Sequence, residues 1–172
     1  MAHDSEDRGI PGDVRWLTAG QRLVWMDMFR VLTRLPAALD AQLERDSGLT
    51  FFEYHVLALL SEVPGHTLRL SRVAQLISSS LSRLSNVVKR LEARGLVRRE
   101  PDPDDGRATR AVLTDAGMAT VEQAAPGHVA NVRDLIIDAL DDAQLEALRV
   151  AHQQILTRLD PVAITRPEWL ET

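Results

Sequence analysis

The chain has 172 residues, of which 45% are hydrophobic and 26% charged, and it carries a net charge of −5 with no cysteine. The lack of cysteine excludes disulfides, thiolate metal sites and thiol-based redox switches. The polar, acidic start lacks the apolar core of a signal peptide, and the longest apolar run, Val56 to Leu60, is too short to span a bilayer. We therefore expect a soluble cytoplasmic protein with no membrane partner.

The charge is distributed unevenly along the chain. Residues 68–114 contain ten Arg or Lys against five acidic residues, a net charge of +5, whereas the remainder holds ten against twenty, a net charge of −10. A basic module within an acidic protein is the pattern expected when one face docks on nucleic acid.

The first elements have clear start and stop signals. Residues 1–14 are expected to be a disordered tail, and 15–48 an N-terminal dimerisation helix. Thr18 and Gln21 form a capping-box pair, Pro36 should bend the helix, and Gly48 should end it in a left-handed conformation. A second capping box, Thr50 with Glu53, opens the next helix, which should stop before Pro64.

The region 49–114 reads as a winged helix-turn-helix. A minimal strand at 68–70 is followed by a short helix capped by Ser71 and a turn of serines. A helix over 81–94 should turn Leu81, Leu84, Val88 and Leu91 inward. Strands at 96–100 and 110–113 should form a hairpin, with a tip at 101–107 rich in turn-forming residues.

Two further helices are predicted within 115–160, with a kink or break at Pro126-Gly127 in the first and Asp141 with Gln144 capping the second; 161–172 is expected to be a C-terminal tail. The apolar stripes of the two terminal regions have no partner inside so small a domain, which indicates homodimerisation. The fold class is therefore mainly α: a winged helix-turn-helix with a small three-stranded sheet, flanked by N- and C-terminal dimerisation helices.

The candidate DNA-binding residues lie on the outer face of the 81–94 helix, in the preceding turn and short helix, and at the hairpin tip. Arg suits guanine, Asn suits adenine, and Ser and Lys suit bases or phosphates. Arg107 at the tip could enter a minor groove, its rotamer fixed by the Asp105 carboxylate. The set is Ser71, Arg72, Ser79, Ser80, Ser82, Arg83, Ser85, Asn86, Lys89, Arg90, Asp105 and Arg107.

Three segments together resemble the MarR family of regulators: 91–99, the tip 102–107, and 112–117. The family's D-x-R and L-T hallmarks fall on Asp105, Arg107, Leu113 and Thr114, and the resemblance extends from about residue 17 to 159. Residues 125–129 are similar to a branch common among actinobacterial members. The resemblance implies a dimer that binds an inverted-repeat operator, most often as a repressor, and is released by a small aromatic or anionic ligand.

That resemblance also implies an effector pocket, for which the candidates are Trp25, Phe29, Tyr54 and His55, with Arg22 or Arg30 as an anion partner; the alternative for Trp25 and Phe29 is a dimer core. We expect no metal, because the five histidines include no pair at metal-binding spacing, and no cofactor. An enzyme is disfavoured because no catalytic motif is present. A non-specific architectural DNA binder remains the alternative function, although it predicts a uniformly basic chain.

Overall fold

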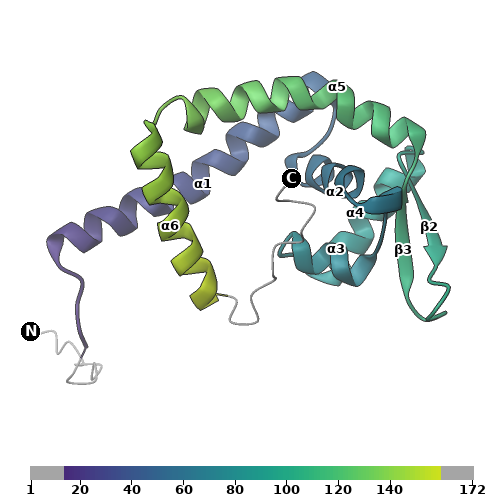
Figure 1. Cartoon of the computed structure of the whole chain (residues 1–172), viewed down its shortest axis with the longest axis horizontal. Coiled ribbons are helices and arrows are strands. Elements are labelled where there is room, and N and C mark those ends of the chain that lie inside the picture. Colours follow the sequence, from purple (N-terminus) through teal and green to yellow (C-terminus); the bar gives the residue numbers. More distant parts are fainter. Residues whose placement is uncertain (1–13, 160–172) are drawn as a thin grey trace, which may run out of the picture. The chain divides into compact units, whose positions relative to one another are not determined.

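The computed structural model describes residues 14–159; the two predicted tails lie outside this range except for Val14 at its start. As predicted, the chain is mainly helical with one small sheet (Figure 1). Its elements, in chain order, are α1 (Ala19–Ser47), α2 (Phe51–Glu62), the short turn η1 (Pro64–His66), β1 (Thr67–Arg69), α3 (Leu70–Leu76), α4 (Leu81–Ala93), β2 (Val97–Pro101), β3 (Thr109–Leu113), α5 (Asp115–Val132), the π-helical turn η2 (Arg133–Ile137) and α6 (Asp142–Leu159).

The chain divides into two compact units, one up to Pro36 and one from Ala37 onward. Helix α1 starts at the predicted capping pair: the Thr18 N–H donates to Gln21 Oε1 at 2.9 Å, and the Gln21 N–H donates to Thr18 Oγ1 at 3.3 Å. The helix continues through Pro36, and the predicted bend there stays a prediction. It ends before Gly48, which takes the predicted left-handed conformation with φ of 63°.

The core of the second unit forms where α2 packs against α4 and the sheet. Leu57, Leu60, Leu84, Val88 and Leu91 are completely buried, in agreement with the three-and-four spacing of α4. The capping box of Thr50 and Glu53 is present at the start of α2, where its two reciprocal hydrogen bonds satisfy otherwise unpaired backbone N–H groups.

The inward set of α4 differs from the predicted one at two positions. Leu81 is 53% exposed, so its predicted inward orientation was wrong, whereas Val87 is buried. Leu81 is the first residue of the helix, where no preceding turn covers it, and side chains of helical residues lean toward the N-terminal end. A face assignment from spacing alone therefore fails at this end of the helix.

The sheet has the order β1-β3-β2, with both pairs antiparallel. Strand β1 ends at Arg69, which pairs with Arg110, and α3 begins at the next residue. The prediction that Ser71 caps α3 was therefore wrong: the position before the helix is Arg69, whose side chain makes no capping hydrogen bond. Ser71 lies inside the first turn of α3.

Helix α5 is built onto the end of the hairpin by residues of the predicted L-T segment. Leu113 is buried, and the Thr114 hydroxyl accepts from the Gly117 N–H and donates to the Gly95 carbonyl. A Cβ on Gly117 would lie 2.1 Å from the Leu96 carbonyl oxygen, so only glycine permits this close approach.

Of the kink or break predicted at Pro126-Gly127, the break does not occur, since α5 is continuous to Val132; a kink there stays a prediction. Packing against α2, with Val121 and Ala124 buried, holds the helix where local propensity disfavours it. The irregularity comes later, in the π-helical turn η2.

The loop between β2 and β3 is organised around the buried carboxylate of Asp102, whose side chain is 2% exposed. Arg69 donates to both of its oxygens at 2.7 Å, a bidentate ion pair between β1 and the loop. The backbone N–H groups of Asp104 and Asp105 donate to Oδ1 at 3.0 and 3.2 Å, and Arg110 Nε lies 3.6 Å from Oδ2. One carboxylate thus holds together β1, β3 and the loop between β2 and β3.

We predict that Asp102→Asn destabilises the fold at neutral pH and that the loss depends on pH. Hydrogen bonds from Arg69 hold the pKa of the Asp102 carboxyl below its ordinary value of 3.8. A lowered pKa means that the ion pair stabilises the folded state fully above the ordinary pKa and ceases to do so as the pH falls through the lowered one. Urea unfolding from about pH 7 to about pH 3 should show the wild-type advantage shrinking only at the acid end.

Asp104→Asn is the matched control, since this carboxylate is 86% exposed and lies 3.9 Å from Arg69. It should unfold like the wild type throughout the pH range. Equal stability of Asp102→Asn and the wild type at neutral pH would refute the role given to Asp102.

Candidate nucleic-acid interface

Helix α4 presents a polar outer face that begins at a capped N-terminus. Ser80 is the residue before the helix, and its hydroxyl accepts from the Arg83 N–H at 3.3 Å. Ser85 is half-buried, whereas the other predicted side chains of the helix are exposed: Ser82, Arg83, Asn86, Lys89 and Arg90.

At the hairpin tip, Arg107 is exposed, but its carboxylate neighbour acts differently from the prediction. Asp105 Oδ1 accepts from the backbone N–H of Arg107 at 3.1 Å, and the Asp105 carbonyl accepts from Ala108 at 2.8 Å. The guanidinium of Arg107 makes no ion pair with any carboxylate of residues 14–159. Asp105 therefore shapes the turn of the loop, and the predicted rotamer lock on Arg107 is absent, because Asp105 is bonded to the loop backbone.

A cleft of about 370 Å³, here called the wing-side cleft, brings α3, α4 and the hairpin tip together. It joins three of the predicted residues that are far apart in sequence: Ser71, Ser85 and Arg107. Its full lining is Leu70, Ser71, Leu81, Ser85, Asp105, Arg107, Ala108 and Thr109.

The ten basic residues of the 68–114 module fall into two groups. Six contact a carboxylate: Arg69, Arg90, Arg94, Arg98, Arg99 and Arg110. The other four make no ion pair with a carboxylate of the described part of the chain: Arg72, Arg83, Lys89 and Arg107. All four belong to the predicted DNA-binding set, so the positive charge that is not neutralised within the protein lies where the sequence placed the interface.

Arg90, the remaining predicted cation, is tied to the start of α2. Its Nε donates to Glu53 Oε1 at 3.2 Å, and Arg94 Nη1 lies 3.7 Å from Glu53 Oε2 and donates to the Gly48 carbonyl. Glu53 is buried, and because it contacts both arginines, this capping residue of α2 also holds the C-terminal end of α4 in place.

On the same side of α4, the Arg83 guanidinium lies 4.4 Å from the centre of the Phe52 ring, a cation–π contact. A cleft of about 390 Å³, here called the Phe52 cleft, opens beside it. Its lining combines one aromatic ring with two arginines and a carboxylate: Asp40, Thr50, Phe52, Arg83, Asn86, Val87 and Arg90.

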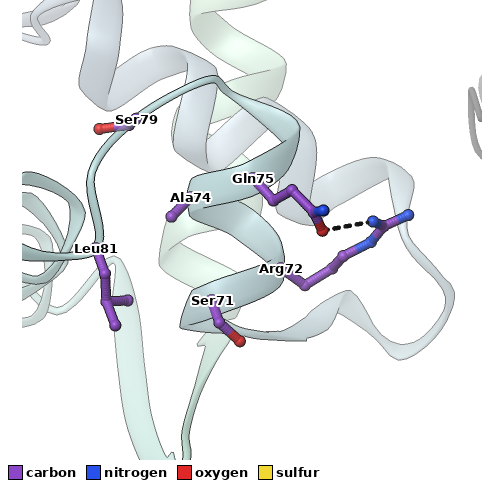
Figure 2. Close-up of a pocket in the computed structure, with 6 residues that line it drawn as sticks. All are labelled: Ser71, Arg72, Ala74, Gln75, Ser79 and Leu81. Atoms are coloured by element: carbon purple, nitrogen blue, oxygen red, sulfur yellow. Dashed lines mark hydrogen bonds between the residues drawn. The ribbon is translucent and has the colours of Figure 1, made fainter. Parts of the chain in front are cut away.

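Three of the predicted residues, Ser71 and Arg72 of α3 and Ser79 of the turn before α4, line a further cavity of about 520 Å³ (Figure 2). Arg72 Nη1 donates to Gln75 Oε1 at 2.8 Å, which extends the guanidinium along α3. Ser71, Ser79 and Leu81 contribute to the same lining.

The predicted effector residues are divided between the two units. Trp25 and Phe29 lie before Pro36, with ring centres 6.4 Å apart and both rings more than half exposed. In the second unit, Tyr54 is buried with its ring centre 4.5 Å from that of His128, and Phe51 lies 5.6 Å from His55. Desolvation lowers the pKa of both histidines, so neither supplies a positive charge at neutral pH.

Sequence reasoning missed the residues that hold the interface in place, namely Phe52, Glu53, Arg69 and Asp102. For Asp102 a signal was available, because aspartate followed by proline in a turn commonly bonds to the backbone ahead of it. No signal links Arg69 to Asp102 or Glu53 to Arg90, since these partners are 33 and 37 residues apart.

Within residues 14–159, no helix is both long and apolar enough to cross a membrane. Nor do three or more potential metal-ligating His, Asp or Glu side chains gather at one place among these residues.

Comparison with known proteins places this geometry in one family. The sequence model of the MarR family matches residues 47–108. The transcriptional regulator PecS of Dickeya dadantii is 30% identical over 109 residues, which cover 61% of this chain and 66% of PecS.

Two solved structures match a larger share of the chain than the family model does. Sco3205, a MarR family transcriptional regulator of Streptomyces coelicolor crystallised in complex with DNA, is 39% identical, with a TM-score of 0.84 over 87% of this chain and 94% of its own. CouR of Rhodococcus jostii, crystallised with p-coumaroyl-CoA, is 26% identical, with a TM-score of 0.67 over 77% of this chain and 90% of its own. PecS and Sco3205 are both transcriptional regulators, which is the function that the sequence predicted for this chain. This chain belongs to the MarR family of DNA-binding transcriptional regulators.

Proposed function

We propose that the chain acts as a homodimeric repressor that binds an inverted-repeat operator and is released by a small anionic ligand. In this proposal residues 49–114 bind DNA, and residues 15–48 and 115–160 form the dimer. The observation that carries it is the partition of charge described above, in which Arg72, Arg83, Lys89 and Arg107 have no carboxylate partner in the described chain. Unneutralised cations on one face are what a phosphate backbone attracts.

Sequence readout is assigned to α4, because its exposed Asn86 and Arg83 carry the chemistry that pairs with adenine and guanine edges in the major groove. The hairpin tip with Arg107 is assigned to an adjacent minor groove, where width and A·T content are read. Sco3205, bound to DNA in its crystal structure, supports DNA as the partner of this fold.

We predict that Asn86→Ala and Arg107→Ala weaken operator binding in different ways. Asn86→Ala should cost about 1–3 kcal/mol and relax the preference at one base pair per half-site, with the salt dependence unchanged. Arg107→Ala should weaken binding to all operators and lower the slope of log K against log salt by about 0.9 per wing. Fluorescence anisotropy titrations at several salt concentrations measure both quantities.

Arg98→Ala is the matched control, because Arg98 lies in the same hairpin but its Nε donates to Glu100 Oε1 at 2.6 Å. It should leave the salt slope nearly unchanged. If Asn86→Ala keeps every base preference while Arg107→Ala keeps the affinity and the slope, the assignment of α4 and the hairpin tip is wrong. An architectural DNA binder would have no base preference for Asn86→Ala to relax, whereas Arg107→Ala would still lower its affinity and its salt slope.

Dimerisation is supported by apolar side chains that no part of the same unit covers. None of the residues of α6 is buried, and its exposed apolar residues include Leu148, Ile155, Leu156 and Leu159. In α1 before Pro36, Leu23, Trp25, Phe29 and Leu32 are all more than half exposed. A second copy of the chain, related by a two-fold axis, would cover both stripes and set two copies of α4 about 10 base pairs apart on DNA.

We therefore predict that Leu156→Glu weakens the dimer by about tenfold or more, because it places a carboxylate in an apolar interface. Sedimentation velocity over a range of concentrations measures the change. Gln154→Glu adds the same charge on the opposite face of α6 and should leave the dimer intact. A Leu156→Glu protein that sediments as the wild type does would contradict the proposed interface.

Ligand release is assigned to the Phe52 cleft, because it joins an aromatic ring to Arg83, Asn86 and Arg90. An anion with an aromatic ring bound there would occupy two of the side chains that read DNA. The histidine cluster around Tyr54 offers rings without positive charge, so the cleft is better suited to anions. CouR, with p-coumaroyl-CoA bound, shows that one relative takes an aromatic, anionic ligand.

We predict that benzoate raises the melting temperature of the wild type and lowers its affinity for the operator, whereas neutral benzamide does neither. Binding to the folded state stabilises it in proportion to RT ln(1 + [L]/Kd). Phe52→Leu should remove both effects while keeping the apolar packing of this half-buried position. The cleft is not the site if Phe52→Leu responds to benzoate as strongly as the wild type, and Trp25, Phe29, Tyr54 and His55 then become the candidates.

A further inference from the structure

One apolar side chain stands among the polar groups of the DNA-facing surface. Leu81 is 53% exposed, whereas the next apolar residue of the same helix, Leu84, is completely buried. It is the first residue of α4, directly after the capping Ser80. Because Leu81 is largely exposed, packing in the core does not account for a leucine at this position.

The surroundings of Leu81 are two adjoining cavities. It lines the cavity beside α3, across from Ser71 and Ala74 (Figure 2), and it also lines the wing-side cleft with Ser85 and Arg107. The side chain therefore stands between α3 and the hairpin tip. The two linings combine hydroxyls and two arginines with the buried residues Leu70 and Ala74 and with Ala108. Among these lining residues Leu81 is the one large apolar side chain that is exposed, which is too small an area for an apolar patch that would dock a protein.

We propose that Leu81 is a specificity-determining residue that contacts the 5-methyl group of a thymine in the major groove. The edges of the base pairs present one apolar feature there, the thymine methyl group, and the other features are hydrogen-bond donors and acceptors. The N-terminal residues of a recognition helix are those that reach base edges, and Leu81 is the first of them. The inference rests on the proposed function, in which α4 enters the major groove.

Ser85 follows Leu81 by one helical turn and lines the same cleft. Its hydroxyl can donate to or accept from a neighbouring base or phosphate, which would fix the position of α4 along the groove. In that arrangement, Leu81 selects thymine at the outer position and Asn86 reads a base further along the helix.

The test replaces each thymine of the operator, one position at a time, with deoxyuridine, which differs only by the missing methyl group. At one position per half-site, the wild type should bind about fourfold more weakly, the equivalent of about 0.8 kcal/mol for one buried methyl group. Leu81→Ala should bind the intact operator more weakly by a similar factor and should be insensitive to deoxyuridine at that position. Leu81→Met, which retains an apolar contact, should keep the sensitivity.

Because Leu81 is exposed, these variants should keep the wild-type melting temperature, which is measured alongside. The inference is overturned if Leu81→Ala responds to every thymine replacement as the wild type does, or if no replacement affects the wild type. Asn86→Ala on the same operators separates the two levels of the argument. If Asn86→Ala relaxes the preference at one base pair but the Leu81 variants respond to every thymine replacement as the wild type does, only the inference about Leu81 is refuted. If Asn86→Ala leaves every base preference unchanged, the reading of the major groove by α4 is refuted.

Discussion

The buried carboxylate of Asp102 is the point on which the geometry of the interface depends. It holds Arg69 of β1 and lies close to Arg110 of β3, and it accepts two backbone N–H groups of the loop that carries Arg107. A loop of this composition has little apolar surface to bury, so it cannot be held by packing. A single ionised group with several donors around it supplies that order, because each hydrogen bond to a charged acceptor is stronger than a neutral one.

Glu53 plays the corresponding part at the other side of α4. It completes the capping box of α2 and contacts both Arg90 and Arg94, so the start of one helix is bonded to the C-terminal half of another. Asp102 and Glu53 contact four of the six arginines of the 68–114 module that pair with a carboxylate, and Glu92 and Glu100 contact the other two. Acidic residues neutralise the arginines that build the fold, and the cations without such partners face outward. Basic charge alone would not separate these two groups.

The terminal regions obey a different constraint. The core of the second unit combines residues of α2, α3, α4 and the sheet with Leu43 of α1 and with Val121 and Ala124 of α5, whereas α6 buries none of its residues within the described chain. An amphipathic helix gains most of its stability from the face that it packs against another surface. The proposed dimer would supply that surface. The contacts between the terminal helices of the two copies would then also determine the distance between the two copies of α4.

The sequence by itself determined the order of the elements and most of their ends. Capping pairs such as Thr18 with Gln21 and Thr50 with Glu53, and the left-handed Gly48, are local signals that depend on neighbours three or four residues apart. It also predicted most of the exposed polar face of α4, because the spacing of the buried leucines fixes which residues of the helix face outward.

Tertiary structure decided what local signals cannot encode. It kept α5 continuous through Pro126, since packing against α2 outweighs helix propensity. It left Leu81 exposed at the first position of α4, because no preceding helical turn is present there to cover the side chain. In the folded chain Asp105 is hydrogen-bonded to the loop backbone, and Asp102 and Glu53 form the ion pairs with Arg69 and Arg90. Arg69 is 33 residues from Asp102 and Arg90 is 37 residues from Glu53, and only the folded chain brings these partners within hydrogen-bonding distance.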